Sequence, residues 1–382
     1  MDLETFLEHK PLYYSEIDYS RMPRVYKSIK EQLKIPKIIH VVGTNGKGTT
    51  GRFIANMLMS HGKHVGHYSS PHILEFNERI WINGNYVRNS ILQAAHERLQ
   101  ELLLFEDSEA LSYFEYTTFL AMLCFKDCDY VVLEAGLGGE HDATNVFEKV
   151  LSVITPIALD HQDFLGDTIF SIATTKCNSI TKRVVVGYQR YSVALSTCKS
   201  IAEKKEASFY TIDSVINAQE HREIEAIALK NHLPLYLKEN LLLALSAVKL
   251  LGFAVDSTSI SVELPFGRFY QYRDNIIIDV GHNPLAAEAI AAAFLKKKAI
   301  LVYNSYADKE YREILKILKP VLERVEILEI DDERIEDKAV LEQSLDELNI
   351  SYCDFSSIDE GTQYLVFGSF KVVEAFVRGG YA

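Results

Sequence analysis

A glycine-rich segment near the N-terminus constrains the fold of this chain more than any other feature. The apolar run Ile38–Val42 leads into Gly43-Thr-Asn-Gly-Lys-Gly-Thr-Thr50, and residues 52–59 then have the composition of a helix. In such a strand–turn–helix unit, glycines let backbone N–H groups converge on phosphate oxygens, and the helix N-terminus adds positive potential. Lys47 can reach the terminal phosphates, and a threonine hydroxyl can bind Mg2+. The segment therefore predicts a phosphate-binding loop in an α/β domain.

Two details separate this segment from the common pattern G-x-x-x-x-G-K-[ST]. Gly43 lies only three residues before Gly46, and Gly48 separates Lys47 from Thr49. A glycine-rich turn that binds no ligand is the alternative interpretation. The apolar strand before the loop, the lysine and the hydroxyls all favour phosphate binding.

The first two thirds of the chain alternate between apolar runs and helical patterns. Nearly continuous apolar runs indicate strands that are covered on both faces, and they lie at Ile38–Val42, Tyr130–Glu134, Leu151–Thr155 and Arg183–Gly187. Helical patterns lie between them, at residues 50–61, 90–105, 116–125 and 168–180. This alternation predicts an α/β fold with a doubly wound parallel sheet, like that of P-loop NTPases.

A second alternation begins after Leu264-Pro-Phe-Gly267 and predicts a further α/β unit. Strands are expected at residues 275–280, 299–303, 325–330, 351–355 and 364–367, and helices at 284–297, 309–318, 337–348 and from Phe370 onward. We therefore expect two domains. Residues 1–262 form the larger one, which contains the phosphate loop, and residues 263–382 form a smaller, Rossmann-like domain.

Composition argues against several classes of protein. The 382 residues include 40 Lys and Arg against 53 Asp and Glu, a net charge of −13, so we expect no general attraction to nucleic acid or to an anionic membrane. The five cysteines form no C-x-x-C pair, which predicts reduced thiols. The sequence shows neither a secretory signal nor an apolar stretch of spanning length. We expect a monomeric, cytoplasmic protein that acts on small molecules.

Three polar residues after the phosphate loop are candidates for a metal site or its surroundings. Ligands of open parallel sheets bind outside the carboxyl ends of the strands. Glu134 ends a predicted strand and is placed to hold a metal beside the phosphates, although a carboxylate there can also cap a turn. His161 follows the next strand, where a structural histidine is the alternative. Lys176, within a predicted helix, is by default a solvated charge.

The second predicted domain contributes polar residues at its start and at the end of its first strand. Arg268 follows the Pro-Phe-Gly turn and can stabilise phosphate charge. In Asp279-Val-Gly-His-Asn-Pro284, Asn283 is a good N-cap before a proline at the first helical position. Capping does not explain Asp279 and His282, which makes them candidates for a polar site.

Several motifs occur in one order along the chain: Gly43-Thr-Asn-Gly-Lys-Gly-Thr49, Tyr68-Ser-Ser-Pro-His72, Phe76-Asn-Glu-Arg-Ile80, Glu134-Ala-Gly-Leu-Gly-Gly139, Asp142-Ala-Thr-Asn145, Leu159-Asp-His161 and Asp279-Val-Gly-His-Asn-Pro284. Together they resemble the folylpolyglutamate synthase/dihydrofolate synthase family of the Mur-ligase superfamily. The resemblance runs from about Phe6 to Phe370. The chain departs from it at Glu140, where many relatives carry arginine, and in overall length, which is shorter than that of typical members.

The resemblance assigns roles to residues that the sequence alone leaves open. It implies Mg2+ ligands at Thr49, Ser70, Glu134 and His161, with Lys176 in the place of the lysine that the family carbamylates. It implies ATP contacts at Thr44, Asn45, Gly46, Lys47, Gly48, Thr49, Thr50, Asn240, Arg268, Asp279 and His282, of which Lys47, Arg268 and His282 are expected to be catalytic. It implies pterin contacts at Ser112, Phe114, Glu115, His141, Asp142 and Ala143.

The activity implied by the resemblance is ATP-dependent amide formation. L-Glutamate is joined to dihydropteroate, to the γ-carboxyl group of a folate, or to both, through an acyl phosphate. The larger domain is then expected to bind ATP and pterin, and the smaller one to serve the ligation of glutamate. Two alternatives remain: a Mur-type amino-acid ligase, against which Gly48 and the Ser70-Pro-His72 loop argue, and a nucleotide switch that hydrolyses ATP without ligation.

Overall fold

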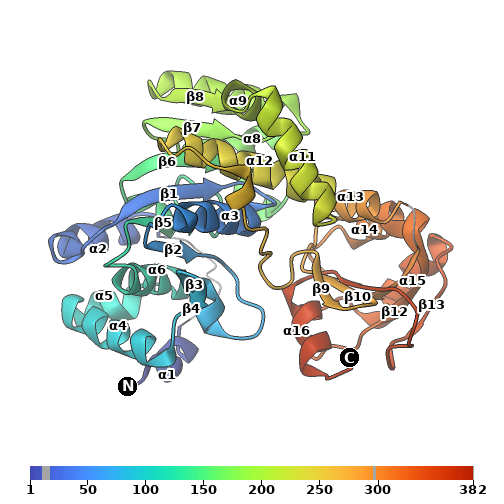
Figure 1. The fold of residues 1–382 in the computed structure, drawn as a ribbon. Coiled ribbons are helices and arrows are strands. Elements are labelled where there is room, and N and C mark those ends of the chain that lie inside the picture. The colour runs from blue at the N-terminus through green and yellow to red at the C-terminus, as the bar shows by residue number, and fades with distance from the viewer. Residues whose placement is uncertain (11–17, 296–297, 382) are drawn as a thin grey trace. The chain divides into compact units, whose positions relative to one another are not determined.

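The computed structural model describes residues 1–10, 18–295 and 298–381, and the chain divides into two compact units. The first unit comprises Met1–Ile227 and Glu239–Val262. The second comprises Ala228–Lys238 and Glu263–Ala382, so a short segment that precedes Glu239 in the chain packs with the C-terminal residues. Each unit has its own sheet and its own hydrophobic core (Figure 1).

The first unit is built on an eight-stranded sheet in the order β4-β3-β2-β5-β1-β6-β7-β8. All neighbouring pairs from β2 to β8 are parallel, whereas β3 and β4 join antiparallel at one edge. Strand β1 therefore lies inside the sheet, between β5 and β6 (Figure 1). The bounds are β1 Lys37–Val42, β2 Val65–Tyr68, β3 Ile80–Ile82, β4 Asn85–Tyr86, β5 Tyr130–Glu134, β6 Lys149–Ile154, β7 Arg183–Val186 and β8 Ser208–Thr211.

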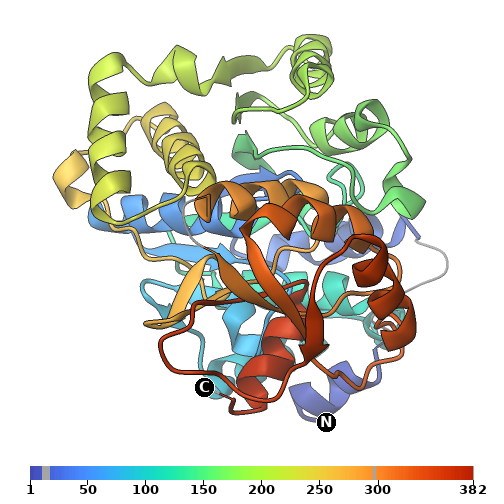
Figure 2. The ribbon, with the colours of Figure 1, turned by 90° about the vertical axis from the view of Figure 1, so that its right-hand side faces the viewer.

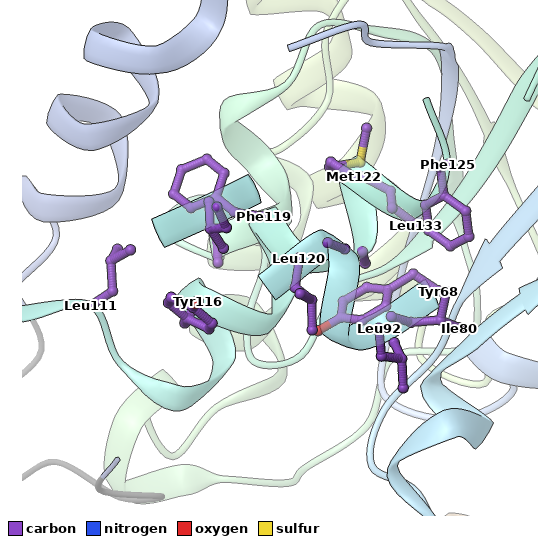
Figure 3. Packing of buried hydrophobic residues seen from close by; sticks show 14 of the residues in the cluster. Tyr68, Ile80, Leu92, Leu111, Tyr116, Phe119, Leu120, Met122, Phe125 and Leu133 are labelled. Atoms are coloured by element: carbon purple, nitrogen blue, oxygen red, sulfur yellow. The ribbon is translucent and has the colours of Figure 1, made fainter. Parts of the chain in front are cut away.

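The helices that connect these strands bury most of the apolar surface of the first unit. One core cluster joins side chains of the N-terminal helices, of α4 and of α6 to β1, β2 and β5, and Figure 3 shows its centre around Tyr68, Tyr116 and Phe119. The helix bounds are α1 Leu3–Glu8, α2 Arg21–Ile29, α3 Lys47–Ser60, α4 Asn89–Leu102, α5 Phe105–Ala110, α6 Tyr113–Cys124, α7 Gln162–Leu165, α8 Ile169–Cys177, α9 Ser192–Lys204, α10 Ile212–Val215, α11 Ala218–Lys230 and α12 Leu235–Leu250.

Helices α8 and α9 pack together in a second core cluster, and here one expectation from the sequence is wrong. Cys177 of α8 and Cys198 of α9 are both fully buried and are joined as a disulfide, with their Cα atoms 5.4 Å apart. The sequence does not predict this pairing, because the two cysteines are 21 residues apart and form no recognisable motif. The other three cysteines, Cys124, Cys128 and Cys353, are free thiols.

The second unit has a six-stranded sheet in the order β13-β12-β11-β14-β10-β9, in which only β9 is antiparallel to its neighbour. The sheet and its helices can be followed in Figure 2. The strand bounds are β9 Tyr270–Arg273, β10 Ile276–Asp279, β11 Ala299–Tyr303, β12 Leu322–Ile327, β13 Tyr352–Asp354 and β14 Tyr364–Phe367. The helices are α13 Pro284–Ala293, α14 Tyr311–Leu318, α15 Lys338–Glu347 and α16 Phe370–Arg378.

The predicted fold class is confirmed: both units are α/β, and both sheets are mainly parallel. Strands β1, β5, β6, β7, β10, β11, β12, β13 and β14 coincide with predicted runs to within three residues at either end. The last two residues of the predicted helix 284–297 lie outside the described residues. Within the described ranges, no helix is both long and apolar enough to cross a membrane.

Candidate active site

The glycine-rich loop after β1 is held in place by the chain that follows β6. The backbone N–H groups of Thr44 and Asn45 donate to Pro156 O at 2.9 and 3.3 Å. Gly43 approaches β6 so closely that a Cβ atom would lie 1.9 Å from Thr155 Oγ1, so only glycine fits here. Gly46 has a φ of +84° and forms the N-cap of α3. The loop therefore ends at a helix N-terminus, the geometry that suits phosphate oxygens.

Lys47 lies beside the carboxylate of Glu134 at the carboxyl edge of the sheet. Its Nζ atom donates to Thr44 O at 3.2 Å and lies 3.8 Å from Glu134 Oε1. Glu134 is brought there because it ends β5, the parallel neighbour of β1. Gly48 leaves room for this carboxylate, since an added Cβ would lie 3.3 Å from Glu134 Oε2.

The oxygen atoms next to Glu134 suit a divalent cation. Ser70 N donates to Glu134 Oε2 at 3.4 Å, which brings the Ser70 loop to the carboxylate, and Thr49 lies buried in the first turn of α3. Among the described residues, no three His, Cys, Asp or Glu side chains form a group that could hold a metal. One carboxylate with hydroxyl groups fits Mg2+, which usually completes its coordination with phosphate oxygens and water.

Lys176 is buried against the phosphate loop and is not a solvated charge. Only 4% of the residue is exposed, and its Nζ atom donates to Gly43 O at 3.0 Å. Burial, together with the positive charge of Lys47, lowers the pKa of Lys176 to about 7. A large fraction of this amine is therefore unprotonated and nucleophilic at neutral pH.

His161 lies on a loop that is hydrogen-bonded to the phosphate loop. Thr44 Oγ1 donates to Ala158 O and accepts from Ala158 N, both at 3.1 Å. His161 follows with a φ of +51°, and its Nε2 atom lies 3.9 Å from Asp160 Oδ2. The histidine side chain is 43% exposed, so it remains accessible to a ligand.

Asn240 of α12 reaches the N-terminus of α3 and has an unused donor. A Cβ atom added to Gly46 would lie 2.7 Å from Asn240 Oδ1, which shows how closely the amide approaches the loop. Asn240 is 3% exposed, and its Nδ2 atom has no hydrogen-bond partner in the described part of the chain. The same holds for the buried hydroxyl of Thr50. An orphaned buried donor beside a phosphate loop indicates a ligand acceptor.

Two of the predicted pterin residues have structural partners. Ser112 and Glu115 form a capping box at the start of α6: Glu115 N donates to Ser112 Oγ at 3.1 Å and Ser112 N to Glu115 Oε2 at 2.8 Å. Arg21 Nε also donates to Glu115 Oε2 at 2.8 Å. Their proposed contact with pterin therefore rests on the resemblance alone.

Aromatic rings surround the other predicted pterin residues. Phe114 stacks on Tyr68 with ring centroids 5.9 Å apart, and an added Cβ on Gly136 would lie 2.7 Å from the Phe114 ring. The exposed His141 lies against Tyr19, with centroids 4.3 Å apart. Tyr19 precedes α2 in the N-terminal part of the chain.

Asp142 begins the 3-10 helix Ala143–Val146 and is tightly bound. Its carboxylate accepts from Leu137 N at 2.8 Å and from Thr144 N at 2.9 Å, and it is 7% exposed. Burial raises the pKa of Asp142. Ala143 is buried at the first position of the same helix. The hydrogen bonds to Asp142 therefore fix the orientation of its carboxylate.

The candidate residues of the second unit cluster around the end of β10. Asp279 accepts from Phe269 N at 2.8 Å and from Gly281 N at 2.7 Å, so its carboxylate orders the turns on either side of it. Burial raises the pKa of Asp279, which the charge of Arg268 partly offsets. The guanidinium of Arg268 lies over the ring of Phe370, 4.7 Å from its centroid. His282 Nδ1 is 3.1 Å from Val280 O.

Sequence reasoning missed three buried polar residues near the acceptor candidates: His40 in β1, Thr144 beside Asp142, and Lys149 at the start of β6. Only His40 carried a signal, because it is a polar side chain within a predicted covered strand and such residues are seldom buried without partners. Thr144 and Lys149 lie outside the predicted strands.

Comparisons with known proteins find similar sequences and similar structures. No family model matches the chain. It is 31% identical over 409 residues to a dihydrofolate synthase/folylpolyglutamate synthase of Haemophilus influenzae, covering 92% of this chain and 91% of that protein. The crystal structure of Helicobacter pylori folylpolyglutamate synthetase is 40% identical, has a TM-score of 0.81 and covers 98% and 97% of the two chains. Escherichia coli FolC, in complex with DHPP and ADP, is 28% identical with a TM-score of 0.83, covering 99% and 97%.

Proposed function

Because the chain belongs to the dihydrofolate synthase/folylpolyglutamate synthase family, we propose that it is an ATP-dependent ligase that joins L-glutamate to a pteroate or folate carboxyl group. The observation that carries this proposal is the arrangement around the phosphate loop. Lys47, Glu134 and Lys176 converge on the N-terminus of α3, and Asn240 adds an unused donor.

The reaction requires activation because a carboxylate resists attack by an amine. The acceptor carboxylate attacks the γ-phosphorus of ATP, the bond to the β,γ-bridging oxygen breaks, and ADP leaves. The amine of glutamate then attacks the carbonyl carbon of the acyl phosphate, loses a proton and displaces inorganic phosphate. Both steps depend mainly on positioning and charge neutralisation.

Residues of this chain supply most of that neutralisation. The N-terminus of α3 would face the phosphates, whereas the N–H groups of Thr44 and Asn45 already donate to Pro156 O. Lys47 Nζ lies 3.8 Å from Glu134 Oε1, where its positive charge can stabilise the terminal phosphate during transfer. Arg268 and His282 remain predicted contributors to the phosphoryl step, and Asp279 a predicted ATP contact.

ATP and a divalent cation serve the family's reaction, and in this chain Thr49, Ser70, Glu134 and His161 would hold Mg2+. Bound there, Mg2+ would neutralise charge on the transferred phosphoryl group. The fit rests on the Glu134 carboxylate, which the Ser70 backbone contacts, and on the accessible ring of His161.

Lys176 is proposed to carry a carbamate. An unprotonated amine adds to the carbon of CO2 and loses one proton, so a cation becomes an anion. The pKa of about 7, lowered by burial, makes the free amine available, and a negative charge would relieve the repulsion between Lys176 and Lys47. Carbon-13 NMR of protein equilibrated with labelled bicarbonate tests this: a carbamate signal is expected in the wild type and absent from Lys176→Met.

The acceptor is proposed to bind with its pterin ring near Phe114, His141 and Asp142, with Ala143 beside it and Ser112 and Glu115 bounding the start of α6. We propose that both dihydropteroate and reduced folates are accepted, as in a bifunctional enzyme. We also propose that the protein acts as a monomer in the cytoplasm, since no sequence feature points to a membrane or nucleic-acid partner. Light scattering of the purified protein tests the monomer.

The deciding experiment measures ADP release with Mg-ATP and L-glutamate. Dihydropteroate, tetrahydrofolate and no acceptor are compared, and the ligated product is identified by mass spectrometry. Turnover with both acceptors is expected for the bifunctional ligase. ADP release that needs no acceptor would overturn the proposal in favour of a nucleotide switch.

A further inference from the structure

A buried chain of hydrogen bonds ends at Asp142. His40 Nε2 lies 2.7 Å from Thr144 Oγ1, and Thr144 Oγ1 donates to Asp142 Oδ1 at 2.5 Å. On the other side of the ring, Lys149 Nζ lies 3.5 Å from His40 Nδ1. None of these four residues is more than 7% exposed. They come from β1, from the 3-10 helix after β5 and from β6, which are close together only in the fold.

Each hydrogen bond in this series is donated in the direction of the Asp142 carboxylate. The Lys149 ammonium can only donate, so His40 Nδ1 is the acceptor and the proton of the neutral ring sits on Nε2. His40 Nε2 then donates to Thr144 Oγ1, whose single hydroxyl proton is left for Asp142. Burial and the charge of Lys149 lower the pKa of His40 well below its ordinary value, which keeps the ring neutral. The direction of every bond is thus determined.

Lys149 also connects this series of hydrogen bonds to α8, the helix that carries Lys176. Lys149 Nζ donates to Asn145 Oδ1 and, at 3.2 Å, to Ser179 O just after α8. Ser179 Oγ donates to Lys176 O at 2.7 Å. Lys149 therefore contacts both the acceptor-side segment that contains Asp142 and the end of the helix that presents Lys176 to the phosphate loop.

We propose that His40, Thr144 and Lys149 are positioning residues that orient the carboxylate of Asp142 toward the pterin ring of the acceptor. The inference rests on the proposed function. An aminopyrimidine ring presents adjacent N–H donors, which pair with the two oxygens of a carboxylate only when the carboxylate plane is fixed. A hydroxyl that donates to one oxygen and a backbone N–H that donates to the other fix that plane.

The test compares four variants in the ADP-release assay, one of which, Lys149→Met, changes the far end of the hydrogen-bond series. Thr144→Val keeps the volume and removes the hydroxyl, Thr144→Ser keeps the hydroxyl, and Ser152→Ala serves as a matched control. Ser152 lies opposite His40 in the pairing of β1 and β6, and its buried hydroxyl has no partner within the described residues.

We expect Thr144→Val to raise the KM for dihydropteroate about tenfold, the effect of a lost hydrogen bond to a charged group. The KM for Mg-ATP should stay within about twofold of the wild type. Thr144→Ser should recover most of the acceptor affinity, and Ser152→Ala should behave like the wild type. Lys149→Met should shift the acceptor KM in the same direction, which checks the far end of the chain. Thermal melting and ADP calorimetry on each variant establish that it is folded.

Three results would overturn the inference. An acceptor KM unchanged in folded Thr144→Val, with an active wild type, would refute the positioning role alone. An equal loss of kcat with all acceptors and no change in KM would assign these residues to stability. If the wild type shows no acceptor-dependent turnover, the proposed function fails and the inference fails with it.

Discussion

Replacing Lys47 by methionine removes one positive charge from the phosphate loop and keeps the length of the side chain. Lys47 and Glu134 are 15% and 5% exposed, so water screens this charge poorly. At about 4 Å, two unit charges interact by ~4 kcal/mol at an effective dielectric constant of about 20. Mutagenesis of preorganised donors at other active sites gives about 3–4 kcal/mol, or about 100- to 1,000-fold in kcat. We therefore expect kcat/KM to fall about 1,000-fold.

The stability of the variant should change little, because two effects oppose each other. Glu134 loses the cation beside it, which destabilises a buried carboxylate. Lys176 loses a like-charged neighbour, since the charge of Lys47 is one of the causes that lower its pKa. We expect a melting temperature within about 2 °C of the wild type, because about 1 kcal/mol shifts the midpoint of a protein of this size by only about 1–2 °C.

The assay is acceptor-dependent ADP release, with thermal melting as the measure of folding. Lys182→Met is the control, because Lys182 pairs with Glu148 at a site where both side chains are 83% exposed. A folded Lys47→Met protein that keeps more than about a tenth of the wild-type kcat/KM would refute the role of Lys47.

Three further predictions follow from the same geometry. Lys176→Met should be more stable than the wild type at pH 7, and the difference should shrink toward pH 10. Burial lowers the pKa of Lys176 to about 7 from 10.5, so between these pH values the unfolded wild type binds a proton that the folded form lacks. The stability of the wild type therefore rises with pH. Urea unfolding in carbonate-free buffer measures this, and a difference independent of pH would contradict it. Gly139→Ala should lower kcat, because the new Cβ would lie 2.7 Å from Lys176 O and displace the helix that carries Lys176; steady-state kinetics with wild-type kcat would count against it. Ser112→Ala should lower the free energy of unfolding by about 1 kcal/mol through loss of the N-cap and leave the KM for ATP unchanged; a variant as stable as the wild type would disprove the capping role.

The nucleotide-binding part of the molecule could be predicted because its signals are local. A covered strand, a glycine-rich turn and a helix lie within some twenty consecutive residues, from Lys37 to Ser60. The position of Glu134 could be predicted for the same reason, since it ends a strand of continuous apolar residues. The Ser112-Tyr-Phe-Glu115 capping box is also a local pattern, although the resemblance to a family directed attention to pterin binding instead.

Other parts depend on neighbours that are distant in sequence. Strand β2, Val65–Tyr68, contains glycine and histidine and gives no apolar run; its Gly66 packs against Phe125, sixty residues away. The strands β3, β4 and β9 escaped prediction for another reason: they are only two to four residues long, too short for a pattern to show. The burial of Lys176 could not be predicted from the helix that carries it, because the covering atoms belong to the loop at Gly43.

The burial of α3 has an evolutionary consequence. Every residue from Gly48 to Leu58 of this helix is buried. The predicted phosphate-binding loop therefore leads into a part of the molecule that tolerates few substitutions. Among the acceptor candidates Asp142 is also buried, but His141 is exposed in a turn, where sequence change is less costly. New substrate ranges can therefore arise by exchange of turns while the inherited phosphoryl chemistry stays constant.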